Sequence, residues 1–230
     1  MATDIGGLLL DATTWVLPVL FAITLHEAAH GFVAWHLGDD TAYRQGRVTF
    51  NPLKHVDAFG TIILPAMLLL LRAPFLFGWA KPVPVAFGRL RHPRRDMVLV
   101  AAAGPATNLV LAAFSAMLFH LLWLLPESAA HWAAQTLYNS ILLNLVLAVF
   151  NMIPLPPLDG GRVAIGLLPR ELALPLARLE RYGFLILIGL IFILPLIGSQ
   201  FGFELNLFFV IVWTPVTWLL PAFAALAGIG

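Results

Sequence analysis

The sequence predicts an all-α polytopic membrane protein with about five transmembrane helices, a short re-entrant or interfacial segment and a small β-like element. Apolar residues make up 60% of the chain and charged residues 11%, and the mean hydropathy is +0.91. Soluble domains are far less apolar than this. Five apolar runs are long enough to cross a hydrocarbon core of about 30 Å at about 1.5 Å per helical residue.

The five predicted spans cover residues 12–37, 96–125, 132–150, 183–201 and 205–229. The last contains Pro215 and Pro221, which a transmembrane helix tolerates because neighbouring helices satisfy the freed carbonyl groups. Residues 58–71 are also apolar, but they number only 14 and contain Pro65. That length suits a re-entrant or interfacial segment better than a span.

The basic residues are confined to two stretches of the chain and predict its topology. The stretches are 38–95, with Arg44, Arg47, Lys54, Arg72, Lys81, Arg89, Arg91, Arg94 and Arg95, and 154–182, with Arg162, Arg170, Arg178 and Arg181. If 58–71 does not cross, the positive-inside rule places both stretches in the cytoplasm, the N-terminus outside and the C-terminus inside. We therefore expect a multi-pass protein of the cell membrane.

Composition also limits the other classes of function. A net charge of +1 gives no reason to expect a nucleic-acid partner, and the absence of Cys excludes disulfides and thiolate metal ligands. The first apolar run lacks a basic n-region, so no cleavable signal is expected. We expect one integral membrane domain over 1–230, with a core at 8–170 and accessory helices at 183–230.

The run His26-Glu27-Ala28-Ala29-His30 places ionisable side chains inside the first span. Two histidines four residues apart share a helical face and can bind one zinc ion, and the intervening Glu27 can take a proton from the attacking water. A paired histidine in a soluble helix is often only a satisfied core residue. In a membrane span, ionisable residues favour a functional site.

Helix geometry estimates the depth of this motif. His26 lies 14 residues after Ala12, about 21 Å along the helix, which places it roughly 9 Å inside the cytoplasmic edge of the apolar core. Hydrolysis at that depth requires a water-accessible cavity.

Asp159 is the candidate for a third metal ligand, because catalytic zinc usually takes three protein ligands. It follows Pro154, Pro156 and Pro157, which must end the preceding helix, and topology places it on the same side as His26 and His30. The alternative is that Asp159 caps the next helix or forms a turn with the following glycines.

Five motifs together resemble the site-2 protease family of intramembrane metalloproteases. They are HEAAH at 26–30, NPLKHVD at 51–57, GWAKPVPV at 78–85, AGPATN at 103–108 and NMIPLPPLDGGR at 151–162. The resemblance covers roughly residues 20–170. It implies that His26, His30 and Asp159 bind one catalytic Zn²⁺ and that Glu27 is the general base. The chain resembles a compact member without a PDZ or CBS domain.

Three further polar residues are candidates for substrate binding or for support of the ligands. Asn151 could bond a substrate backbone or orient Asp159, or it could simply end its helix. Asn108, with Gly104 and Pro105, could bond across two closely packed helices. His55 is expected to support the site or the fold. Asn144 lies on a helical face similar to that of Asn151, so the two amides could line one interior polar seam.

Two segments outside the spans carry weaker predictions. Residues 78–85 alternate apolar residues with Pro82 and Pro84, which is consistent with a substrate-facing edge strand or with a plain Pro-rich connection. Residues 167–182 mix Arg and Glu with Leu and Ala, which predicts an interfacial amphipathic helix.

The predicted activity is therefore that of a zinc endopeptidase in regulated intramembrane proteolysis. It would cut a transmembrane helix, from a single-span protein, near the cytoplasmic face. The alternative is a metal transporter or an inactive metal-binding membrane protein, although the outer half of the first helix offers only Thr13, Thr14 and Thr24 as polar groups. The sequence leaves the substrate, the regulator and the oligomeric state open.

Overall fold

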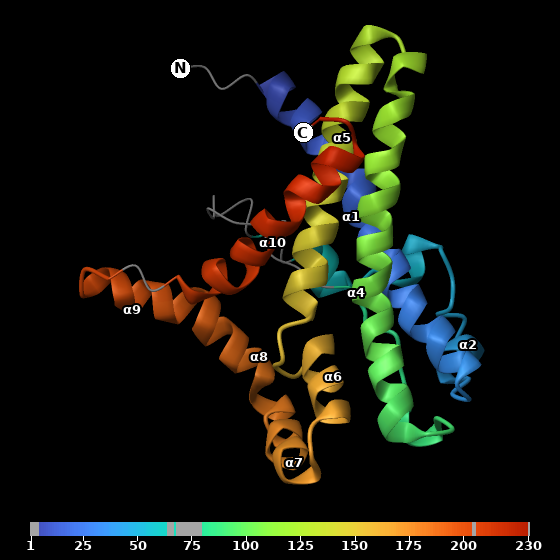
Figure 1. Ribbon diagram of the computed structural model, residues 1–230, viewed down its shortest axis with the longest axis vertical. Coiled ribbons are helices and arrows are strands. Elements are labelled where there is room, and N and C mark those ends of the chain that lie inside the picture. Colours follow the sequence, from blue (N-terminus) through green and yellow to red (C-terminus); the bar gives the residue numbers. More distant parts are fainter. Residues whose placement is uncertain (1–4, 64–66, 68–79, 204–205, 230) are drawn as a thin grey trace.

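The computed structural model describes residues 5–63, 67, 80–203 and 206–229. Within these ranges the regular elements are helices and there is no strand (Figure 1). Three long helices form the centre of the molecule: α1 (Ile5–His36), α4 (Pro93–Leu118) and α5 (Glu127–Asn151). Each of them packs against the other two, so the polar side chains of all three can meet inside one bundle.

Short elements connect the central helices. Between α1 and α4 lie α2 (Thr41–Arg44), the 3₁₀ helices η1 (Pro52–Lys54) and η3 (Phe87–Arg89), and the π-helix η2 (Ala58–Ile63). The 3₁₀ helix η4 (Phe119–Leu124) continues α4. After α5 come α6 (Asp159–Leu167), α7 (Arg170–Arg178), α8 (Glu180–Ile188), η5 (Gly189–Ile193), α9 (Leu194–Gln200) and α10 (Leu207–Leu226). The stretch from α8 to α9 leads away from the bundle, and α10 returns to pack against α5 and α4 (Figure 1).

Five helical stretches in the described ranges are long and apolar enough to cross a membrane. They are Leu10–His36, Pro93–Leu124, Glu127–Asn151, Glu180–Gln200 and Phe209–Leu226. They coincide with the five predicted spans, so the prediction of a multi-pass helical membrane protein is confirmed. Only part of the predicted re-entrant segment falls within the described residues, where Ala58–Ile63 forms a single π-helical element.

Small side chains let the central helices approach closely. Ala112 and Ala116 of α4 are fully buried against Ile141 and Leu145 of α5, and Val216 of α10 joins the same cluster. Small residues at helix contacts are typical of membrane bundles, where close van der Waals packing takes the place of a hydrophobic driving force. Large apolar side chains such as Phe21 and Phe114 instead lie exposed on the outside of the spans.

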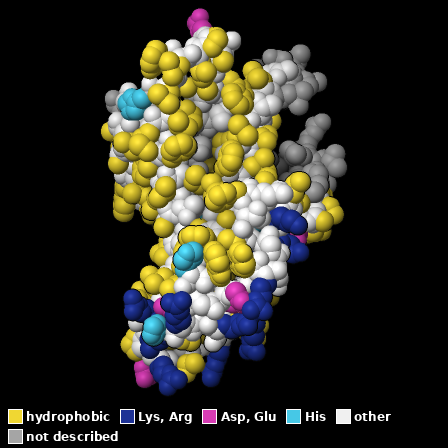
Figure 2. Space-filling model, turned by 90° about the vertical axis from the view of Figure 1, so that its right-hand side faces the viewer, with side chains coloured by type: hydrophobic (Ala, Val, Ile, Leu, Met, Phe, Trp, Pro, Cys, Tyr) yellow, Lys and Arg dark blue, Asp and Glu magenta, His cyan; other side chains and the backbone are white. Residues whose placement is uncertain are grey.

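The basic side chains gather at one end of the molecule. Figure 2 shows Lys and Arg concentrated there, while hydrophobic side chains cover most of the remaining surface in that view. The elements at this end are α2, α6 and α7 (Figure 1), which belong to the two basic stretches of the sequence. The range 167–182, predicted as one amphipathic helix, is divided in the structure: it holds the last residue of α6, all of α7 and the first turn of α8.

The predicted β-like element at 78–85 is wrong for the residues that the structure describes. Gly78 and Trp79 lie outside them, and residues 80–85 form no regular secondary structure. Pro82 and Pro84 have no amide hydrogen, and the neighbouring amides bond elsewhere: Lys81 N donates to the His55 carbonyl at 2.8 Å and Ala86 N to Asp39 Oδ2 at 2.6 Å. The alternating Pro and apolar residues therefore belong to a segment whose remaining amides bond to separate parts of the fold and not to a neighbouring strand.

We expect Gly183→Ala to destabilise the fold, because α8 crosses the proline segment at this glycine. A Cβ at Gly183 would overlap the Pro156 carbonyl and the Pro157 ring, which are not flexible side-chain ends. Overpacking of this kind costs about 1–3 kcal/mol in free energy of unfolding. Thermal unfolding in detergent measures the loss. The matched control is Gly189→Ala, where an added Cβ meets nothing within 4 Å. Equal unfolding temperatures for the two variants would contradict the packing described here.

Candidate metal centre

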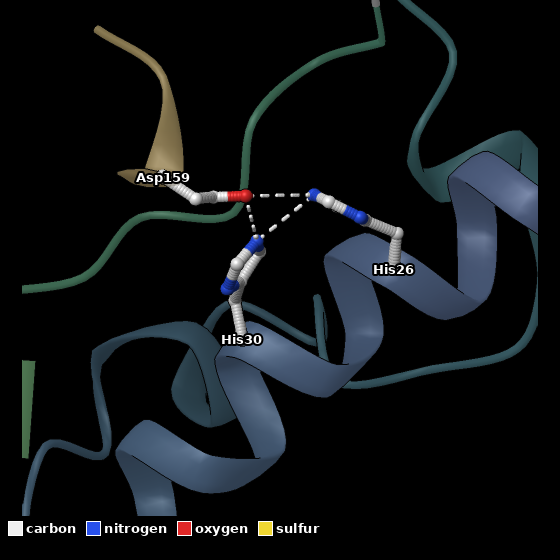
Figure 3. A group of neighbouring side chains, drawn as sticks. All are labelled: His26, His30 and Asp159. Carbon is white, nitrogen blue, oxygen red and sulfur yellow. Dashed lines mark hydrogen bonds and ion pairs between the residues drawn. The ribbon is translucent and has the colours of Figure 1, made fainter. Parts of the chain in front are cut away.

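Helix α1 presents two histidine rings on one buried face. His26 and His30 are one helical turn apart, and their residues are 7% and 8% exposed. The rings meet edge to face, with centroids 4.7 Å apart, and their Nε2 atoms lie 3.0 Å from each other. The four-residue spacing therefore directs both nitrogens to one point, as Figure 3 shows.

Asp159 reaches the same point from the start of α6. Its Oδ2 lies 3.2 Å from His26 Nε2 and 3.3 Å from His30 Nε2 (Figure 3). The backbone of residues 152–156 folds tightly against the first turn of α6, because Gly160 and Gly161 leave no side chain in its way. The prolines thus do more than end α5: they return the chain so that Asp159 faces α1.

Among the described residues, His26, His30 and Asp159 form a cluster that could hold a metal ion, with the candidate ligand atoms all within 4.8 Å of one another. Bonds of about 2.0–2.1 Å to a tetrahedral zinc place adjacent ligand atoms about 3.3 Å apart. The observed separations of 3.0, 3.2 and 3.3 Å are close to that value. Two imidazoles and a carboxylate are also a usual ligand set of catalytic zinc, so the residues fit the ion.

The far nitrogen of each ring is held by an oxygen. His30 Nδ1 lies 2.7 Å from the Val100 carbonyl of α4, and His26 Nδ1 lies 2.6 Å from Asn108 Oδ1 on the same helix. Because these oxygens can only accept, both Nδ1 atoms carry the proton and both Nε2 atoms present lone pairs. Such outer contacts orient metal-binding imidazoles in proteins generally.

The carboxylate completes a site that favours a cation. Asp159 Oδ2 is buried, and among the described residues it has no hydrogen-bond partner. Burial raises the pKa of Asp159, but the His26 and His30 rings, when protonated, outweigh it and hold that pKa well below its usual range. An ionised carboxylate at this buried position needs a positive partner, which is either a ring proton or a metal ion.

Glu27 lies on α1 between the two histidines and is anchored by backbone. Its Oε2 accepts a hydrogen bond of 2.7 Å from Val83 N, in the irregular segment that carries Pro82 and Pro84. Gly31, one turn further along α1, lets this segment come close, because a Cβ there would already lie 3.0 Å from Val83 Cγ1. The segment is thus a support for the Glu27 side chain.

The other predicted site residues have different positions. Asn108 contacts His26, as described above. Asn151 donates from Nδ2 to the Leu147 carbonyl of its own helix at 3.0 Å. His55 is buried, and its Nε2 lies 3.0 Å from the Thr49 carbonyl. Neither Asn151 nor His55 belongs to the described metal cluster, and the contacts of His55 tie together the connection between α1 and α4.

Gly104 proves to lie directly against the metal cluster. A Cβ at this position would overlap His30 Nε2 and the His26 ring. The sequence suggested close helix packing at Gly104 and Pro105. The structure shows in addition that the missing side chain leaves room for the two ligating nitrogens.

The comparisons with known proteins identify the family. The model of peptidase family M50 matches residues 122–196. YwhC of Bacillus subtilis is 42% identical over 185 residues, which cover 79% of this chain and 80% of YwhC. The chain belongs to peptidase family M50. The resemblance to site-2 proteases is thereby confirmed, and so is the predicted enzyme class of metalloprotease.

Other relatives of this M50 peptidase are more distant. Rip2 of Mycolicibacterium smegmatis is 31% identical over 205 residues, covering 89% of this chain and 74% of Rip2. Rip2 of Mycobacterium tuberculosis (strain H37Rv) is 31% identical over 183 residues, covering 80% and 68%. All three relatives are named as zinc metalloproteases. No solved structure gives a significant match.

We expect Gly104→Ala to abolish metal binding by this M50 peptidase while leaving its helices folded. The added methyl group would occupy the space of the His26 and His30 nitrogens. Metal content after purification, measured by atomic emission, should fall well below that of the wild type. Circular dichroism should show unchanged helicity. Gly189→Ala is again the control, and a full complement of metal in Gly104→Ala would show that the rings do not bind it.

Proposed function

We propose that this protein is a zinc-dependent endopeptidase that cuts a peptide bond within or near a transmembrane helix of a membrane protein, close to the cytoplasmic face. The observation that carries the proposal is the convergence of Asp159 Oδ2 on His26 Nε2 and His30 Nε2 of a membrane-spanning helix, beside the half-buried Glu27 carboxylate. One zinc ion would be held by these three residues and leave a position open for the reaction.

The chemistry divides between the ion and the side chains. Zinc, when bound, supplies Lewis-acid polarisation of the scissile carbonyl and lowers the pKa of water to about 7. Glu27 accepts the proton of the attacking water as the new C–O bond forms. It then passes that proton to the nitrogen as the C–N bond breaks, so the products are a carboxylic acid and an amine, which become a carboxylate and an ammonium group once the acid proton moves to the amine.

The anchoring of Glu27 serves this role. A carboxylate that accepts one hydrogen bond from Val83 N through Oε2 has a fixed orientation and keeps the lone pairs of its other oxygen for the water. Preorganisation of this kind removes the cost of finding the reactive geometry during the reaction.

The proposed orientation follows from the end of the molecule at which Lys and Arg gather. If that end faces the cytoplasm, as the positive-inside rule favours, the N-terminus lies outside and the metal site lies nearer the inner face. The substrate would then be cut near its cytoplasmic end. We propose a single-span substrate in the cell membrane, with the lipid bilayer as the other partner and no nucleic acid.

A transport function receives no support from the polar groups of α1. Asn139 Nδ2 donates to Thr14 Oγ1 at 2.8 Å, and Trp132 Nε1 donates to Thr13 Oγ1 at 2.9 Å. These threonines therefore connect α1 to α5. An ion path to the outer face would need their oxygens as ligands.

Replacing Glu27 by Gln tests the mechanism. Gln keeps an oxygen that can accept from Val83 N, so the side chain should stay in place and zinc should stay bound. Cleavage of a reconstituted single-span substrate should fall about 10²- to 10⁴-fold, because an amide cannot take up the proton. His26→Ala is the control that should lose zinc and cleavage together. Undiminished cleavage by zinc-loaded Glu27→Gln would contradict the role of Glu27 as the general base.

Helix-breaking residues in the substrate should raise the rate of cleavage. A helical substrate hides its amide groups in internal hydrogen bonds, so it must unwind before Glu27 and the metal site can reach the bond. We expect a substrate with Gly-Pro next to the scissile bond to be cut several-fold faster than one with Leu-Leu, as followed by gel analysis in proteoliposomes. Equal rates would mean that unwinding is not part of the rate-limiting step.

A further inference from the structure

A chain of buried side chains leads from the metal ligand His26 across the bundle. His26 Nδ1 lies 2.6 Å from Asn108 Oδ1 on α4, and Asn108 Nδ2 donates to Asn144 Oδ1 on α5 at 2.8 Å. Asn144 Nδ2 in turn donates to the Ser140 carbonyl at 2.8 Å. Asn108 and Asn144 are 0% and 1% exposed, so solvent provides no other partner for their amides.

The direction of this chain is set at its far end. The Ser140 carbonyl can only accept, so the group of Asn144 that faces it must be the NH₂. Asn144 therefore presents its oxygen to Asn108, which must answer with its own NH₂. Asn108 is then left with its oxygen toward His26, and His26 must donate from Nδ1.

The consequence reaches the metal site. A neutral imidazole carries one proton, and a proton on Nδ1 leaves the lone pair on Nε2, the atom that faces Asp159 and His30. If the Asn108 amide were reversed, its NH₂ would face His26, the ring proton would move to Nε2, and that atom could not bind a metal.

Two groups accept a hydrogen bond from Asn108 Nδ2 and so prevent this reversal, and Asn144 makes the shorter of the two contacts. The other is the Ala22 carbonyl, which lies 3.3 Å from Asn108 Nδ2, compared with 2.8 Å for Asn144 Oδ1. His30 offers a contrast, because the Val100 carbonyl contacts its Nδ1 directly. A backbone carbonyl cannot reverse, whereas an amide must be held.

We propose that Asn144 is a positioning residue that fixes the tautomer of His26 through Asn108 and thereby sets the affinity of the site for zinc. This inference rests on the proposed zinc site. It gives Asn144, which lies two side chains away from the ligand atom, a role in metal binding that its neighbour Asn139 does not share.

Asn139 is a matched control on the same helix. Its residue is 2% exposed, its Nδ2 donates to Thr14 of α1 at 2.8 Å, and its Oδ1 accepts from Gln135 at 3.0 Å. It is therefore a buried asparagine of α5 that bonds across the bundle, as Asn144 does, but its bonds do not lead to the metal ligands. Loss of packing or of an interhelical hydrogen bond should affect both positions alike.

The test compares the zinc affinity of the purified full-length protein with that of Asn144→Leu, Asn144→Asp and Asn139→Leu, by competition with a chromogenic chelator in detergent. Loss of a contact that orients a metal-binding histidine typically weakens affinity about 10- to 100-fold. We expect a weakening of roughly tenfold for Asn144→Leu, at the low end of that range. Asn139→Leu should bind as the wild type does.

Asn144→Asp should retain the zinc affinity of the wild type, because an Asp at this position keeps an oxygen toward Asn108 in either protonation state. Substitution with Co²⁺ gives a second readout: its visible absorption should change in Asn144→Leu and be unchanged in the Asp variant. If Asn144→Leu does not fold, Asn144→Ala removes the same acceptor with less crowding and takes its place.

The outcomes separate the inference from the proposed function. Equal affinities for Asn144→Leu and Asn139→Leu overturn the role of Asn144, and so does a failure of Asn144→Asp to retain the wild-type affinity. If His26→Ala binds zinc as tightly as the wild type does, the proposed zinc site itself is overturned.

Discussion

Two imidazole nitrogens and one carboxylate oxygen face one another within about the ligand spacing of a tetrahedral metal, and the surrounding structure depends on holding them there. Both histidines lie in a helix that is apolar enough to span a membrane. A bilayer core offers no water to satisfy the polar atoms around such a site, so the protein must satisfy them itself. The local packing and the irregular segments follow from that requirement.

Two non-helical segments help to satisfy this requirement with their backbone groups. The proline-broken stretch before α6 cannot form helix, and it turns back tightly because Gly160 and Gly161 admit it, which delivers Asp159. In the irregular segment before η3, the Val83 amide donates to Glu27. Its carbonyls at Lys81 and Pro82 accept from the buried Arg47, at 2.6 and 3.3 Å. Irregular backbone at membrane depth is tolerated where it is covered by protein in this way.

The sequence predicted what residue type and spacing encode. Apolar run length identified the five spans, the four-residue spacing paired His26 with His30, and the prolines pointed to Asp159. It could not predict contacts made by backbone, because an amide such as that of Val83 carries no residue-type signal. Alternating Pro and apolar residues were misread as a strand, since a pattern of side chains does not say where the remaining amides bond. The role of Gly104 depends on how two helices cross, which composition does not specify.

The two histidines are supported in different ways, and the packing of α4 on α1 explains why. A helical carbonyl has a second lone pair, so Val100 can accept from His30 at 2.7 Å where Gly104 brings the helices close. One turn away along α1, the group of α4 that meets His26 is the Asn108 side chain. An amide has a donor end and an acceptor end, and it specifies a tautomer only if something else fixes its direction. The second amide, at Asn144, donates to the Ser140 carbonyl, which cannot reverse. The direction of that backbone carbonyl therefore fixes the orientation of both amides and, through them, which ring nitrogen of His26 carries the proton.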